Sequence, residues 1–151
     1  FVDHSRTIPG VTYDIDKNDV DKNEHDKLDI LKDVRVNAIE GLCIAHLNIN
    51  FLYSKFEGLR YLVKDKIDIL VISETKLDNS FTTHQFMIEG FSTPFRKDRN
   101  AHGGGIMIFV RNDIPCKLLK TKYSDKDLEA IFIELNLRRE KWLPMGAYNP
   151  K

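Results

Sequence analysis

The chain has 151 residues, 42% hydrophobic and 30% charged, a composition typical of a globular domain with a buried core. Its longest apolar run, residues 67–72, is far shorter than the roughly 20 residues of a membrane span, and the first residues lack the basic-then-apolar pattern of a signal sequence. Two distant cysteines, Cys43 and Cys116, argue against a disulfide scaffold or zinc site, so we expect an intracellular protein, nuclear or cytoplasmic and not secreted.

Residues 1–40 read as an acidic leader, with 6 Lys/Arg against 10 Asp/Glu and a net charge of −4. They contain too few apolar residues to bury a core, so we expect this leader to be disordered or partly helical, with an amphipathic helix around Asp26–Val36. Residues 41–151 carry a net charge of +4, which is compatible with a polyanionic partner. Because the first residue is Phe rather than Met, we expect a fragment or an incomplete gene model.

From residue 41 the pattern predicts a strand–helix–strand unit. The apolar run 42–48 indicates a strand, and residues 54–63 have the apolar spacing of a helix. Ser54 and Glu57 have the S-x-x-E spacing of a capping box, which would begin the helix at that point. A second strand is expected at 67–73, and the connection through a helix predicts that the two strands are parallel.

The remaining elements are predicted to be strands. The segment QFMIEGFSTPF (85–95) is expected to include a short strand, GGGIMIFV (103–110) a strong one and CKLLK (116–120) another. The segments 129–135 and 142–148 are expected to pair as a hairpin. The three glycines lack the Lys and Ser/Thr of a phosphate-binding loop and indicate a tight turn or a close approach instead. These elements predict a mixed sheet in an α/β, or layered α+β, domain.

Four polar residues follow the predicted strands: Asn48, Asn50, Glu74 and Tyr148. Taken singly, each is typical of a strand that ends at the surface. Taken together they indicate a site, because the carboxyl ends of parallel strands meet at one edge of a sheet and would bring Asn48 close to Glu74. The amide could orient an anion there, and the carboxylate could hold a hard cation. Mg²⁺ is commonly bound by one or two carboxylates together with water and substrate phosphate oxygens, so this pair suits Mg²⁺.

The motifs LCIAHLNINFLYSKFEGL, IDILVISETKLDNSF, DRNAHGGGIMIFVR and MGAYNP have the order and spacing of the endonuclease/exonuclease/phosphatase superfamily. Over residues 41–151 the chain most closely resembles the apurinic-type endonuclease domain of LINE-type retrotransposons. The resemblance implies about the first half of a four-layer α-β-β-α sandwich. It also implies a magnesium-dependent DNA endonuclease, with Mn²⁺ as an alternative metal, DNA as partner and no membrane partner.

The resemblance also implies a role for each site residue. Asn48 would organise the phosphate and metal site, Glu74 would ligate Mg²⁺, and Tyr148 would lie against the scissile phosphate. Asn50 is a weaker candidate metal ligand, since the cellular apurinic endonucleases have Asp at that position and retroelement relatives commonly have Asn. An activated water would attack in line, with the metal stabilising the developing charge.

Two later motifs of the family, Gly-Asp-x-Asn and Ser-Asp-His, do not occur before the chain stops at Lys151. We therefore expect this polypeptide alone to be nearly inactive and marginally stable, with partners in the missing C-terminal half and, in the full-length product, a reverse transcriptase. Two alternatives stay open. One is a phosphatase or phospholipase of the same superfamily, and the other is a non-catalytic retroelement remnant.

Overall fold

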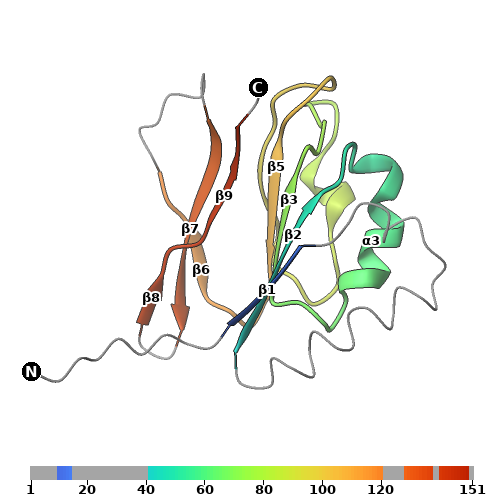
Figure 1. Ribbon diagram of the computed structural model, residues 1–151. Helices are drawn as coiled ribbons and strands as arrows, with labels where there is room; N and C mark the ends of the chain where they lie inside the picture. The colour runs from blue at the N-terminus through green and yellow to red at the C-terminus, as the bar shows by residue number, and fades with distance from the viewer. Residues whose placement is uncertain (1–9, 15–40, 121–127, 138–139, 150–151) are drawn as a thin grey trace, which may run out of the picture.

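A computed structural model describes residues 10–14, 41–120, 128–137 and 140–149, which form an α+β fold with two sheets (Figure 1). The α+β class predicted from the sequence is therefore confirmed. The first sheet has the strand order β1-β2-β3-β5-β4. Its strands are β1 (Gly10–Asp14), β2 (Leu42–Asn48), β3 (Ile69–Ser73), β4 (Phe95–Lys97) and β5 (Ile106–Val110). The second sheet contains β6 (Cys116–Leu118), β7 (Glu129–Leu137), β8 (Glu140–Trp142) and β9 (Met145–Tyr148).

The first sheet is mixed, as predicted. β2 and β3 are parallel, with Ile44 opposite Ile69 and Asn48 opposite Ser73, whereas β5 is antiparallel to both β3 and β4. The parallel pairing predicted for the strand–helix–strand unit is confirmed. Part of the predicted leader joins this sheet, because β1 pairs in parallel with β2. The helix expected around Asp26–Val36 lies outside the described residues.

Helix α3 (Phe56–Val63) follows a short 3₁₀ turn, η1 (Tyr53–Lys55), so the predicted helix begins two residues later than expected. The capping box predicted from Ser54 and Glu57 is wrong, because neither side chain caps the helix. Ser54 lies within the 3₁₀ turn, and Glu57 pairs with Arg60 on the helix surface. In the described ranges no helix has the length and hydropathy of a membrane span.

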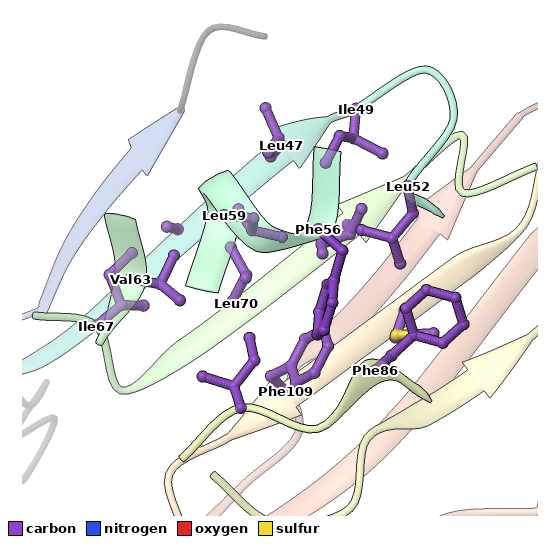
Figure 2. Packing of buried hydrophobic residues seen from close by; sticks show 14 of the residues in the cluster. Leu47, Ile49, Leu52, Phe56, Leu59, Val63, Ile67, Leu70, Phe86 and Phe109 are labelled. Atoms are coloured by element: carbon purple, nitrogen blue, oxygen red, sulfur yellow. The ribbon is translucent and has the colours of Figure 1, made fainter. Parts of the chain in front are cut away.

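One apolar core lies between α3 and the first sheet (Figure 2). Its centre is aromatic, since the rings of Phe56 and Phe86 meet edge to face at 5.2 Å and Phe109 stacks 6.4 Å from Phe56. Phe86 comes from the 3₁₀ helix η2 (Thr83–Phe86), which a capping box between Thr82 and Gln85 begins. Within the segment 85–95, where a short strand was predicted, only Phe95 belongs to a strand, as the first residue of β4. Phe91 makes an isolated bridge with Arg111, and the other residues form loops and part of this helix.

A second core lies between the two sheets and combines side chains from both, Ile69, Ile106, Ile108, Val110, Ile131, Ile133 and Leu135 among them. The predicted hairpin between β7 and the segment that follows it is confirmed. Leu135 pairs with Trp142 and Phe132 with Met145, so the register is the same on both sides of Leu143 and Pro144. The break at these two residues divides one arm of the hairpin into β8 and β9.

The layers follow the order helix, sheet, sheet (Figure 1). In the described part of the chain, α3 and η2 both pack in the first core. The outer helical layer of a four-layer α-β-β-α sandwich stays a prediction.

The buried carboxylate of Asp68 joins strands of the first sheet at one end. The predicted site lies at the other end of the same sheet. Asp68 Oδ2 accepts the Cys43 N–H at 2.7 Å, and Asp68 Oδ1 accepts a hydrogen bond from the Arg111 guanidinium. Asp68→Ala should lower the free energy of unfolding by about 2–4 kcal/mol, because a buried N–H and a cation lose their acceptor. Urea denaturation checks this value.

Asp113→Ala is the matched control, because Asp113 also pairs with Arg111 but its side chain is 60% exposed. We expect the control to change stability by no more than about 0.5 kcal/mol. Equal losses in the two variants would contradict a special role for the buried carboxylate.

Candidate functional site

The carboxyl ends of β2 and β3 meet at one edge of the first sheet, as the parallel pairing requires. Asn48 is opposite Ser73, and the two chains stay hydrogen-bonded beyond the strands. The Ile49 N–H donates to the Ser73 carbonyl at 3.1 Å, and the Phe51 N–H to the Glu74 carbonyl at 3.0 Å. The structure therefore brings the Asn48–Asn50 segment and Glu74 together, as the sequence predicts.

Left-handed backbone is concentrated at this edge. Of the eight described residues with clearly positive φ, six belong to three loops that contact one another there, namely Asn50, Phe51, Glu74, Lys76, Gly104 and Gly105. The loops are joined by hydrogen bonds from the Thr75 N–H to the Gly105 carbonyl and from the Lys76 N–H to the Gly104 carbonyl. Residues other than glycine adopt this conformation at an energetic cost, and such strain clusters at functional sites.

The Glu74 carboxylate is half-buried. Its Oε2 accepts the Gly104 N–H at 3.2 Å, and the carboxylate interacts closely enough with the Tyr148 hydroxyl to shift the pKa of that hydroxyl. Glu74 itself has φ 57°, so the chain turns sharply as it leaves β3. The carboxylate is therefore oriented before any ligand arrives, which is the arrangement expected of a preorganised site.

Tyr148 reaches Glu74 from the other sheet. It is the last residue of β9, whose Gly146 lies close against β3 and β5, where an added Cβ would come within 3.0 Å of Val71 and Ile108. The interaction with Glu74 is the main cause that raises the pKa of the Tyr148 hydroxyl above its ordinary value. Burial and the negative charges of Glu74 and Glu129 act in the same direction, so the hydroxyl stays protonated, and a donor, at neutral pH.

The two predicted asparagines differ in backbone conformation. Asn48 ends β2 in regular register, and Asn50 lies in the loop beyond it with φ 49°. Both side chains are exposed at the edge that carries Glu74. Their amides are thus accessible to a ligand bound beside the carboxylate.

A second carboxylate, Glu129, belongs to the site and was not predicted. Its Oε2 accepts the Gly105 N–H at 2.7 Å, and its Oε1 lies 3.4 Å from Arg99 Nε. Consecutive amides of the glycine loop are therefore held by Glu74 and Glu129. Glu129 is the first residue of β7, opposite Tyr148 in β9. Glu129 could have been found from the sequence, because the predicted hairpin between 129–135 and 142–148 pairs its first residue, Glu129, with its last, Tyr148.

His46 and Ser73 form a polar pair beside the site that was also missed. His46 Nε2 lies 3.2 Å from Ser73 Oγ across β2 and β3, and Ser73 is buried. Because Ser73 precedes Glu74 directly, this pair helps to fix the strand end from which the carboxylate extends. Neither residue belongs to a sequence motif that would have predicted this contact.

Glu129→Ala should lower the free energy of unfolding by about 1–3 kcal/mol, because the buried Gly105 N–H loses its acceptor. Glu129→Gln should cost much less, since an amide oxygen can still accept that hydrogen bond. Arg99→Ala should cost at most about 1 kcal/mol, because the Arg99 side chain is 45% exposed. Urea denaturation of the three variants separates these values, and a Gln variant as unstable as the Ala variant would show that the negative charge matters more than the hydrogen bond.

The oxygen atoms of Glu74, Asn48 and Asn50 are of the type that Mg²⁺ binds when water and substrate complete its coordination. In the ranges that the structure describes, no three His, Cys, Asp or Glu side chains gather as a metal-binding group. Glu74 is accessible beside the exposed amides of Asn48 and Asn50, and Mg²⁺ is commonly held by one or two carboxylates with water and substrate phosphate oxygens. Glu74 is the residue that would hold the ion, and Asn50 is the weaker candidate.

The fold and the site define an α+β protein with a carboxylate–tyrosine pair at the carboxyl edge of a mixed sheet. No protein-family model matches the chain, and no curated protein matches it either.

Proposed function

We propose that this chain carries the phosphate-binding and metal-binding part of a magnesium-dependent DNA endonuclease of the retroelement type, within the endonuclease/exonuclease/phosphatase superfamily. The observation that carries the proposal is the Glu74 carboxylate, held by the Gly104 N–H at the sheet edge shared with Asn48, with the Tyr148 hydroxyl interacting with it from the second sheet. The motif resemblance assigns the same three side chains, Asn48, Glu74 and Tyr148, to one site.

The residues of the site have complementary tasks in this proposal. Glu74 supplies the hard oxygen ligand, the Gly104 N–H orients its carboxylate, and the Tyr148 hydroxyl beside it remains a hydrogen-bond donor. The exposed Asn48 amide is available to donate to a phosphate oxygen. When bound, Mg²⁺ stabilises negative charge that develops on the phosphodiester during attack by water. These residues bind and position a phosphate, and the motif expected to activate the water, Gly-Asp-x-Asn, does not occur in the sequence.

The test measures both binding and cleavage. The affinity of the chain for a DNA duplex is measured by fluorescence anisotropy with Mg²⁺ and with EDTA, and supercoiled plasmid is assayed for nicking. We expect Mg²⁺ to strengthen binding and nicking to be slow. Affinity that does not respond to Mg²⁺, together with no nicking, would overturn the proposal and favour the non-catalytic remnant. Faster hydrolysis of inositol phosphates or sphingomyelin than of DNA would favour the phosphatase or phospholipase alternative.

A further inference from the structure

Three aromatic side chains form a surface beside Glu74 that the proposed chemistry does not use. Tyr53 lies between Phe51 and Phe81, with ring centroids 6.4 Å from Phe51 and 5.1 Å from Phe81. We call these three residues the aromatic patch. Tyr53 is 55% exposed, and the other two rings are half-buried. The patch therefore presents aromatic surface to solvent.

The core supports the patch from below. Phe81 packs against the first core, and its ring lies 6.2 Å from that of Phe86. Arg96 Nη1 donates to the Phe81 carbonyl at 2.8 Å, which fixes the loop that carries this ring. The outer ring, Tyr53, thus rests on a part of the molecule that is firmly packed.

The loop between β2 and α3 fixes the patch relative to Glu74. Phe51 has φ 86°, a conformation that a bulky side chain rarely adopts, and the loop holds it there through several hydrogen bonds. The Phe51 N–H donates to the Glu74 carbonyl and the Leu52 N–H to the Thr75 carbonyl, each at 3.0 Å. Lys55 Nζ donates to the Ile49 carbonyl at 3.1 Å. The loop that carries Phe51 and Tyr53 is therefore joined by backbone hydrogen bonds to the loop that carries Glu74.

Two cations lie on the loops that carry the patch. Between Ile49 and Lys55 the only charged side chain is the cationic Lys55. On the next loop Lys76 lies between the carboxylates of Glu74 and Asp78, and Asp78 accepts hydrogen bonds from the Ser80 N–H and hydroxyl. Exposed aromatic rings beside cations are the usual means of binding single-stranded nucleic acid, because every base offers a flat face for stacking.

We propose that the aromatic patch stacks on bases of the DNA strand next to the phosphate bound at Glu74, and that the chain therefore prefers DNA with unpaired bases at that point. The inference rests on the proposed function. Within a duplex both faces of a base are covered by its neighbours, so a ring can stack only where the base leaves the helix or is already single-stranded.

The test measures the affinity of the full chain for fluorescent oligo(dT) in EDTA, where a metal plays no part. Tyr53→Ala should weaken this binding by about 5- to 100-fold, and Tyr53→Phe should leave it within about 2-fold. Binding to a fully paired duplex should change by less than about 2-fold in both variants. The Tyr53 side chain is exposed, so these changes should leave the fold intact, which circular dichroism checks.

Tyr61→Ala is the matched control. Tyr61 is a 65% exposed tyrosine on α3, beside Glu57, Arg60 and Lys64, and its loss should not alter binding of oligo(dT). Unchanged affinity in Tyr53→Ala, or equal losses in the two tyrosine variants, would overturn the inference. Tighter binding to phosphatidylcholine vesicles than to oligo(dT) would overturn it as well. Failure of the proposed function is distinct, because it appears as an absent response to Mg²⁺ in the parent chain, whereas the oligo(dT) measurement uses EDTA.

Discussion

Glu74→Gln is expected to abolish the Mg²⁺-dependent part of DNA binding and the slow plasmid nicking of the parent chain. The change replaces a charged oxygen ligand by a neutral amide of nearly the same shape. The amide oxygen can still accept the Gly104 N–H, so the loop should keep its conformation. We therefore expect the free energy of unfolding to change by less than about 1 kcal/mol. Anisotropy titrations with and without Mg²⁺, combined with urea denaturation, measure both quantities.

Glu57→Gln serves as the control for this experiment. Glu57 is an exposed carboxylate on α3 whose partner is Arg60, so its loss removes the same charge from the chain at another place. It should leave the response to Mg²⁺ unchanged. If both variants weaken binding equally, the effect of Glu74 would be one of net charge, and the assignment of Glu74 as the metal ligand would be wrong.

Gly105→Ala is expected to lower the free energy of unfolding by about 2–5 kcal/mol, the sum of a backbone and a steric effect. Gly105 has φ 88°, and a Cβ placed there would clash with Oγ1 of the buried Thr75. Neither group can move easily, since Thr75 is packed at the end of β3 and the Gly105 N–H is held by Glu129. Urea denaturation gives the loss directly.

Gly90→Ala isolates the backbone part of that loss. Gly90 has nearly the same φ, 86°, but no atom lies within 4 Å of the position that its Cβ would occupy. We expect this variant to lose only about 1–2 kcal/mol. A loss in Gly105→Ala no larger than in Gly90→Ala would show that the close approach to Thr75 does not matter.

The sequence predicted the parts of the fold that depend on local pattern. The strand–helix–strand unit follows from apolar spacing, and the parallel register follows from the helix between the strands, so Asn48 and Glu74 could be placed at one edge in advance. The start of α3 was misjudged, because Ser54 and Glu57 have capping spacing while the chain first makes a 3₁₀ turn. That turn follows the loop held to Glu74 and Thr75, which is a tertiary effect.

The parts of the site that the sequence did not reveal depend on contacts between distant residues. Glu129 is separated from Gly105 by 24 positions and meets it only because the second sheet packs on the first. His46 and Ser73, 27 positions apart, meet across two strands through side chains with no distinctive spacing. The aromatic patch was likewise hidden, since exposure and the left-handed conformation of Phe51 are properties of the folded loop.

The position of Tyr148 on the second sheet makes the site a product of the contact between the sheets. Glu74 extends from one sheet, its tyrosine partner from the other, and the close fit of Gly146 against Val71 and Ile108 holds them together. Each sheet could keep its own hydrogen bonds if the two drew apart, and Glu74 would keep the Gly104 N–H, but the carboxylate would lose its interaction with Tyr148. Any ligand that binds Glu74 and Tyr148 together must therefore also bind the two sheets to each other, and would stabilise their packing in proportion to its affinity and concentration.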